Sequence, residues 1–415
     1  MRDDFRPRRR LLAALAALPA SAGALPLSAR AAEARTALPG RPEYPVVRRG
    51  VPLVFPRDFG AHPEYRTEWW YITGWLQARA GAGVQAAPMG FQVTFFRSRP
   101  QVDTRNPSRF AARELVLAHV ALSDARQRTL VHDQRTARAG FDLAGSSTAD
   151  TDVWIDDWRL SRRAGGSGDS RLGNALAGGT QAASRYVASI PGNRLGFELQ
   201  LDSTQPLLLH GDAGFSQKGP FARQASYYYT QPQLAVSGRV VHDSKPLEVT
   251  GRAWLDHEWS SEILADGATG WDWIGINLDD GGALMAFRIR DRSGATVYAG
   301  GTLRTGGGDG VGADRSGAGR QRTFDPRSIV FEPQRTWRSA RTGATWPVAM
   351  RVTVGAGTAD ALTLDLEPMF DDQELDARTS TGIVYWEGAI TARSNGRILG
   401  RGYLELTGYH APVVL

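Results

Sequence analysis

A six-residue pattern occurs twice in the chain, as Gly251-Arg252-Ala253-Trp254-Leu255-Asp256 and as Gly400-Arg401-Gly402-Tyr403-Leu404-Glu405. A short glycine-led segment and a turn precede each copy, Gly238-Arg239-Val240-Val241 in the first case and Gly388-Ala389-Ile390-Thr391 in the second. Self-similarity that keeps the chain order indicates a duplicated structural unit. The pattern therefore predicts two related domains in tandem.

The segments around this repeat are typical of β-strands. Trp69–Gly74 with Phe91–Phe96 is echoed by Trp271–Ile276 with Leu284–Ile289, and Val236–Val241 and Leu362–Leu366 are equally short and apolar or alternating. Residues that favour turns bound them, as in Asp279–Gly282 and Ser394–Gly396. Many short strands without interleaved helices favour an all-β fold of barrels or sandwiches.

Length, composition and charge exclude several classes of protein. The chain has 415 residues, 42% of them hydrophobic, and no cysteine. It is neither fibrous, nor disordered, nor a module held by disulfides, and it is long enough for two domains. The formal charge is +6, but residues 1–31 contain six arginines and two aspartates, a net of +4. The remainder carries little excess charge, so we expect no nucleic-acid partner.

Residues 1–31 predict a signal peptide. Arg8-Arg9-Arg10-Leu11-Leu12 matches the twin-arginine pattern, the apolar stretch Leu11–Leu27 follows, and Ala29-Arg30-Ala31 offers a cleavage site between small residues. A membrane anchor is the alternative, but prolines interrupt the stretch and it is short for a span. We expect an N-terminal domain at 32–262, a C-terminal domain at 263–415, export by the twin-arginine route to the periplasm or medium, and no membrane span.

Several signatures of catalytic and cofactor sites are missing. The chain has no Gly-x-Ser-x-Gly motif, and His257-Glu258 lacks the second histidine of a zinc-binding His-Glu-x-x-His. The other histidines have no ligand spacing, and the glycine-rich stretches Ala164–Ala183 and Thr305–Gly319 have no features of a phosphate loop. We therefore expect no metal and no cofactor.

Aromatic residues gather around carboxylates in four segments, Tyr65–Tyr71, Tyr227–Tyr229, Trp254–Trp259 and Trp271–Trp273. Filling of a large core would explain any one of these rings. The carboxylates are more informative, because burial of an acid is costly unless it is paired or neutral. In a strand, Trp254, Asp256 and Glu258 would share one face, and Leu255, His257 and Trp259 the other.

A purely structural explanation for Asp256 also stays open. Either Arg66 or Arg252 could pair with it and neutralise its charge.

The same segments resemble the AttH / carotenoid 1,2-hydratase family, whose bacterial members are often labelled secreted hydrolases or lipocalin-like proteins. The resemblance rests on Arg66–Tyr71, His210–Asp212 with Phe215–Gly219, Tyr227–Leu234 and Trp254–Trp259, and it extends from about residue 50 onward. It implies two tandem lipocalin-like antiparallel β-barrels with an apolar cavity near their junction.

The resemblance also implies a catalytic acid. In the hydratase branch, an aspartate that follows a tryptophan or tyrosine by two residues in a strand protonates an isolated double bond, and Asp256 matches it. A His-x-Trp pair of that branch is replaced here by Tyr227 and Tyr229. We expect Asp256 to be catalytic and a set of aromatic residues to bind the substrate: Trp70, Tyr227, Tyr229, Trp254, His257, Trp259, Trp271 and Trp273.

Two functions stay open at this point. In the first, the exported protein binds a hydrophobic small molecule, such as a lipid, polyene or isoprenoid, and acts as a hydratase or hydrolase by protonating a double bond. An apolar pocket raises the pKa of a carboxylic acid, and aromatic faces stabilise the cation that follows. In the second, implied by the resemblance, the protein is a non-catalytic carrier of a lipophilic ligand, or an accessory factor with an ABC-type membrane transporter as partner.

Overall fold

The computed structural model describes residues 42–79, 87–100, 102, 105–164, 183–306 and 319–413. The predicted signal peptide lies outside the described residues, as do most of the two glycine-rich stretches. Within these ranges the regular structure is β-strand, apart from two short 3-10 helices, η1 (Arg57–Phe59) and η2 (Pro326–Ser328). No helix of the described chain is long and apolar enough to cross a membrane.

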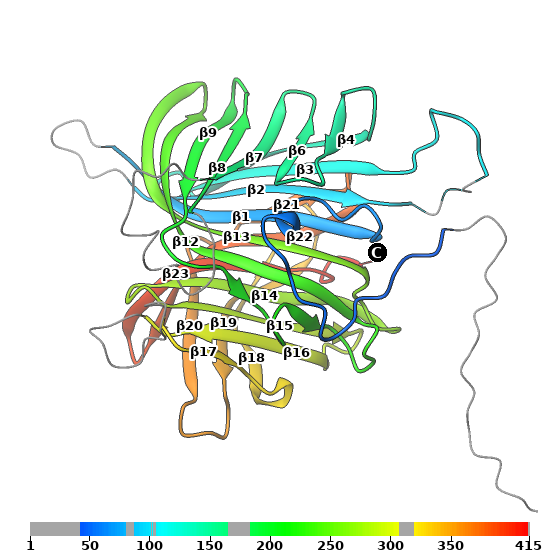
Figure 1. The fold of residues 1–415 in the computed structure, drawn as a ribbon. Helices are drawn as coiled ribbons and strands as arrows, with labels where there is room; N and C mark the ends of the chain where they lie inside the picture. The colour runs from blue at the N-terminus through cyan, green and yellow to red at the C-terminus, as the bar shows by residue number, and fades with distance from the viewer. Residues whose placement is uncertain are drawn as a thin grey trace, which may run out of the picture. The chain divides into compact units, whose positions relative to one another are not determined.

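The strands form two antiparallel sheets that follow one another along the chain (Figure 1). The first sheet contains β1 (Thr67–Ala78), β2 (Met89–Ser98), β3 (Leu115–Asp124), β4 (Thr129–Arg138), β5 (Ala144–Ser146), β6 (Asp152–Ile155), β7 (Trp158–Ala164), β8 (Ser184–Ile190), β9 (Leu195–Asp202), β10 (Leu208–Leu209), β11 (Phe215–Gln217), β12 (Ala225–His242) and β13 (Lys245–Glu262).

The second sheet contains β14 (Ala268–Leu278), β15 (Ala283–Asp291), β16 (Thr296–Arg304), β17 (Gln321–Thr323), β18 (Ile329–Arg338), β19 (Thr345–Val354), β20 (Leu362–Pro368), β21 (Glu374–Ala377), β22 (Ile383–Ser394) and β23 (Arg397–Leu406). The predicted all-β fold is thus confirmed. The six segments that the sequence predicted as strands, 69–74, 91–96, 236–241, 271–276, 284–289 and 362–366, lie within β1, β2, β12, β14, β15 and β20.

The two sheets have corresponding strand orders. The first runs β4-β3-β2-β1-β13-β12-β9-β8-β7 before it adds β6 and β5, and the second runs β17-β16-β15-β14-β23-β22-β20-β19-β18. In register, Tyr71 of β1 lies opposite Asp256 of β13, and Trp273 of β14 lies opposite Glu405 of β23. The repeated six-residue pattern therefore occupies the same place in both sheets.

Each sheet curls so that strands from distant positions in the order come close. In the first sheet, the Arg135 guanidinium of β4 lies over the Trp158 ring of β7 at 4.4 Å and 3.7 Å from Asp156. In the second, Arg288 of β15 donates to the carbonyl oxygen of Phe331 in β18 at 3.1 Å. Curling of this kind encloses the apolar face of each sheet, as in a small barrel.

The apolar core has three main parts. One fills the first sheet and includes Phe91, Leu122 and Leu255, and another fills the second and includes Trp346 and Leu404. A third lies where the sheets meet, and its buried members come from both: Tyr71, Leu208, Tyr228, Trp254, Trp273, Ala283, Met285, Phe287, Ile289, Ala389 and Tyr403.

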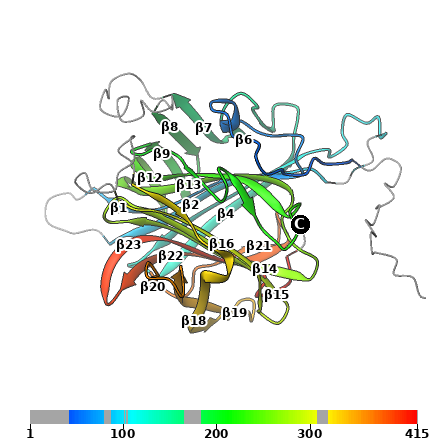
Figure 2. The ribbon, with the colours of Figure 1, turned by 60° about the horizontal axis from the view of Figure 1, so that its bottom comes forward.

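This third part lies along the central strands β1 and β13 of the first sheet and β14 and β23 of the second, which contact one another (Figure 2). The described chain from residue 42 onward belongs to one compact unit, so the domain limits at 32–262 and 263–415 stay a prediction. The change from one sheet to the other falls between Glu262 and Ala268.

Candidate active site

Asp256 is the acid at the centre of the surface where the two sheets meet. Its side chain points out of the first barrel toward the second sheet because it shares a strand face with Trp254, a member of the inter-sheet core. The residue is only 2% exposed. One carboxylate oxygen, Oδ2, accepts from the Tyr228 hydroxyl at 2.7 Å. The other, Oδ1, accepts from the Trp254 indole N–H at 2.7 Å and from the Thr230 hydroxyl.

The donors that the described part of the chain supplies to Asp256 are thus all neutral. Neither Arg66 nor Arg252 is among them: the Arg252 guanidinium donates instead to Gln233 Oε1 at 2.6 Å. The structural explanation left open above, a buried aspartate–arginine pair, is therefore wrong for this residue. Among the described residues, no cation is in hydrogen-bond contact with its carboxylate.

Burial raises the pKa of Asp256 from its ordinary 3.8 to about 7. The hydrogen bonds from Thr230, Tyr228 and Trp254 stabilise the carboxylate and so oppose the shift, while the charge of Glu258 adds to it. A carboxyl group with this pKa is substantially protonated at neutral pH. It can therefore act as a proton donor there, which an exposed aspartate cannot.

The residues behind Asp256 extend the hydrogen-bond network. His210 Nε2 lies 2.6 Å from Thr230 Oγ1. Because Thr230 gives its one hydroxyl proton to Asp256, His210 is the donor in this contact. Lys218 does not reach Asp256; its ammonium pairs with Glu258 at 2.8 Å and lies over the Tyr228 ring at 4.7 Å.

Aromatic rings from both sheets surround this acid. The Trp273 indole N–H, from the second sheet, donates to the Tyr228 hydroxyl at 3.1 Å, and its ring packs edge-on against Trp254 at 6.3 Å and against Tyr71 at 5.3 Å. Gly275 makes room for these rings, because a Cβ there would lie 2.4 Å from the Trp273 ring and 3.0 Å from the Trp254 ring.

A second group of acids occupies the corresponding position in the other half. Glu405 matches Asp256 in the repeat, and Glu387 of β22 lies opposite it in register. Glu387 is 1% exposed, and it accepts a hydrogen bond from Tyr71, the residue opposite Asp256. Burial and the neighbouring Glu405 raise the pKa of Glu387 well above its usual value. Its second oxygen, Oε2, has no partner in the described chain.

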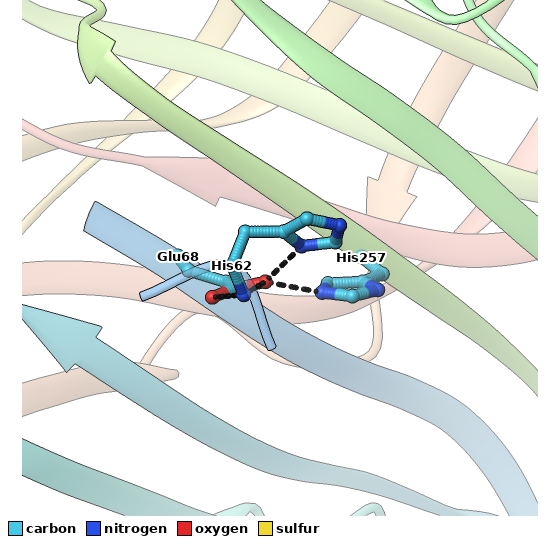
Figure 3. A group of neighbouring side chains, drawn as sticks. All are labelled: His62, Glu68 and His257. Carbon is cyan, nitrogen blue, oxygen red and sulfur yellow. Dashed lines mark hydrogen bonds and ion pairs between the residues drawn. The ribbon is translucent and has the colours of Figure 1, made fainter. Parts of the chain in front are cut away.

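The opposite face of β13 carries a different polar cluster, inside the first barrel. Glu68 Oε1 lies 2.8 Å from His62 Nδ1 and 2.9 Å from His257 Nε2 (Figure 3). The Arg97 guanidinium donates to Glu68 Oε2 at 2.9 Å, and the Tyr229 hydroxyl lies 2.9 Å from His257 Nδ1. Among the described residues, this is where histidines and a carboxylate converge closely enough to hold a metal ion.

The donor set of this cluster fits a hydrogen-bond network better than a metal site. Arg97 is fully buried against Glu68, so a positive charge already lies beside the carboxylate that a metal ion would need. His62 also lies between two acids, Asp58 and Glu68, whose hydrogen bonds raise the pKa of its imidazole despite burial, which lowers it. The sequence analysis did not predict this cluster, because Glu68 and His257 lie 189 positions apart in the chain.

The predicted substrate-binding residues lie on both faces of the first sheet and in the second sheet, so only some of them are near Asp256. Trp254 and Trp273 lie beside Asp256, and Trp271 packs against the same inter-sheet core. On the other face, Trp70 stacks on His257 at 4.8 Å, and Tyr227, Tyr229 and Trp259 form part of a separate apolar cluster. None of the five residues in these two groups surrounds Asp256.

The sequence analysis did not identify two residues that donate hydrogen bonds to Asp256, Tyr228 and Thr230. Strand alternation separates Tyr228 from Tyr227 and Tyr229, but only the register shows which of them meets Asp256. That register shifts at irregularities between Ala225 and Tyr227 and between Gln231 and Leu234. No local pattern in the sequence reveals these shifts.

A cavity of about 380 Å³ opens between the two sheets next to the acid. Trp254 and Tyr403, at matching positions of the repeat, are among its lining residues, and Asp256 lies behind Trp254. Asp256 itself does not line this cavity, and the Trp254 side chain connects the two.

Comparisons with known proteins agree with this architecture. The AttH-like family model matches residues 46–409. The crystal structure of a protein assigned as AttH from Nitrosomonas europaea is 46% identical, covers 88% of this chain and 99% of its own, and superposes with a TM-score of 0.73.

The structure of kievitone hydratase from Nectria haematococca covers 90% of this chain and 98% of its own with a TM-score of 0.59. At 13% identity it shows a shared fold alone. Among curated proteins, none matches the sequence. The match of the family model over most of the chain shows that the protein belongs to the AttH-like family.

Proposed function

We propose that the protein is an exported hydratase that binds a hydrophobic small molecule and protonates an isolated carbon–carbon double bond through Asp256. One observation carries the proposal: a buried carboxyl group, held by three neutral donors and with no cation of the described chain in hydrogen-bond contact, faces a layer of aromatic rings. The fold shared with a protein named as a hydratase supports it.

The chemistry follows from the environment of Asp256. The π electrons of the alkene take the carboxyl proton, and Asp256 becomes a carboxylate that Tyr228, Thr230 and Trp254 stabilise. The adjacent carbon becomes a cation, which the ring faces of Trp254 and Trp273 stabilise by about 0.5–2 kcal/mol each. A water molecule then bonds to that carbon, and the proton it releases returns to Asp256. The sum is alkene plus water giving an alcohol.

The test combines turnover with a labelled solvent. Acyclic isoprenoids that contain an isolated double bond would be incubated with the purified protein in ¹⁸O-labelled water, and the products analysed by mass spectrometry. A hydratase incorporates one labelled oxygen for each alcohol formed. Asp256→Asn should reduce turnover by about 10²–10⁴, as expected when a general acid is lost, while ligand binding persists.

Tyr228→Phe is the matched variant. It retains the acid and the ring but removes one hydrogen bond that stabilises the carboxylate. The pKa of Asp256 should rise, and the alkaline limb of the rate profile should move to higher pH. A purely structural role for Tyr228 would not move this limb.

The alternative is a carrier of a lipophilic ligand that serves a transport system. Native mass spectrometry of the protein from its own periplasm would show whether a lipid or polyene remains bound. A bound ligand that is never converted, with Asp256→Asn binding it as tightly as the wild type, would favour the carrier and overturn the hydratase.

A further inference from the structure

The cavity between the sheets carries a pair of arginines at its rim. Arg252 and Arg401 occupy the same position of the six-residue repeat, so the duplication brings one from each half to the same opening. Both side chains are exposed. Trp75, Asp279, Trp254 and Tyr403 also line this cavity.

Neither guanidinium is neutralised within the described ranges. Arg252 donates to the neutral amide of Gln233 at 2.6 Å, and Arg401 lies over the Trp75 ring at 4.9 Å. Two exposed arginines elsewhere on the strands do pair with carboxylates, Arg185 with Asp202 and Arg351 with Asp365. Asp279 also lines the cavity, so two positive charges against one negative leave a net charge of +1.

The cavity is therefore polar and positive at its rim and aromatic at its floor. Guanidinium groups bind carboxylates and phosphates through paired hydrogen bonds. Both arginines still have donors that no acceptor in the described part of the chain uses. Toward the floor lie Trp254 and Tyr403, with Leu76 and Leu278 among the lining residues. The Trp254 indole at this floor is the side chain that bonds Asp256.

We infer that the ligand of this cavity is an anionic amphiphile, in which Arg252 and Arg401 hold a carboxylate or phosphate head group and an unsaturated hydrocarbon chain lies toward Trp254. The head group is inferred from the cavity alone. The unsaturation of the chain rests on the proposed function, because the chain would then bring a double bond to the acid behind Trp254.

The test uses three ligands with the same polyene and different head groups: retinoic acid, retinyl phosphate and retinol. Equilibrium dialysis would give the Kd of each for the full chain. The wild type should bind at least one of the two anions about tenfold or more tightly than retinol, the range expected for charge-assisted hydrogen bonds. The tighter anion identifies the head group as carboxylate or phosphate.

The variants locate this preference. Arg252→Gln and Arg401→Gln should each weaken anion binding, and the double variant should bind all three ligands with similar Kd. Arg351→Gln, which removes an exposed arginine of β19 that does not line the cavity, should behave as the wild type. High salt should weaken binding of the anions and leave that of retinol unchanged.

Equal affinities for the acid, the phosphate and the alcohol in the wild type would overturn the inference, as would an equal loss for all three in the double variant. The outcome is separable from the proposed function. If the anion preference depends on the two arginines but no alkene is ever hydrated, the binding site stands and the hydratase falls.

Discussion

Asp256→Asn should change how the stability of the protein depends on pH. The pKa of Asp256 is about 7 in the folded chain, against 3.8 when the group is solvated. Between these values the folded state binds more protons than the unfolded state, so the free energy of unfolding falls as pH rises. The contribution of this group is fully present below about pH 4 and is lost as pH rises through about 7.

The size of the effect follows from the shift. Each pKa unit corresponds to about 1.4 kcal/mol, so the difference between 3.8 and about 7 amounts to about 4 kcal/mol of wild-type stability lost across this range. Asparagine does not ionise and loses none of it. The stability of Asp256→Asn relative to the wild type should therefore rise by about 4 kcal/mol from pH 4 to pH 8.

Asp272→Asn is the matched control, because it makes the same change at another fully buried aspartate. The Asp272 carboxylate accepts from Arg288 at 2.6 Å and from Arg290 at 3.0 Å, and it also accepts from the Tyr409 hydroxyl at 3.0 Å. Its loss leaves two largely buried guanidiniums without a counter-charge, which should cost about 3–5 kcal/mol at neutral pH. At alkaline pH, the two substitutions should thus change the free energy of unfolding, relative to the wild type, in opposite directions.

The assay is urea unfolding followed by tryptophan fluorescence at several pH values between about 4 and about 8. Other titrating groups, such as Glu68 and Glu387, occur in both proteins and cancel when the variant is compared with the wild type. If the difference between Asp256→Asn and the wild type stays constant over this range, or falls with pH, Asp256 is not a buried acid of raised pKa.

Replacing Arg8, Arg9 and Arg10 together by lysine should hold the protein in the cytoplasm, because the twin-arginine pathway reads the arginine pair rather than its charge; cell fractionation checks this, and normal export would rule out the route. Glu68→Gln should lower the free energy of unfolding by about 1–3 kcal/mol, because it removes one of the two carboxylates that pair with the buried Arg97 guanidinium and leaves only the partly exposed Glu114; an unchanged urea midpoint would contradict the network. Gly275→Ala should displace the Trp254 and Trp273 rings, since a Cβ would lie 2.4 Å from the latter; near-ultraviolet circular dichroism should change, and a spectrum that matches the wild type would show that the rings are not packed against Gly275.

The fold was more predictable from the sequence than the site. Strand segments such as Phe91–Phe96 and turns such as Ser394–Gly396 are local signals, because alternation and positive φ depend on neighbouring residues; Asn395 and Gly396 do have positive φ. The repeat at Gly251 and Gly400 adds a long-range signal, because a duplicated unit fixes which strands are equivalent. The prominence of Asp256 came from the same repeat and from the family resemblance.

The contacts of the site depend on register and on packing between the sheets, which leave no local pattern. Tyr228 reaches Asp256 from a neighbouring strand that contains two irregularities, and Trp273 reaches Tyr228 from the other sheet. The Glu68 cluster joins residues from distant parts of the chain. The sequence could therefore identify aromatic and acidic residues as a group but could not divide them between the two faces of β13.

The central claim is that Asp256 carries a proton at neutral pH, and infrared difference spectroscopy tests it most directly. Subtracting the spectrum of Asp256→Asn from that of the wild type isolates the carbonyl stretch of one protonated carboxyl group. The structure predicts that this band is present at mildly acid pH and disappears with a midpoint near 7. A difference spectrum that shows only the carboxylate bands, down to the pH at which an exposed aspartate titrates, would contradict the claim.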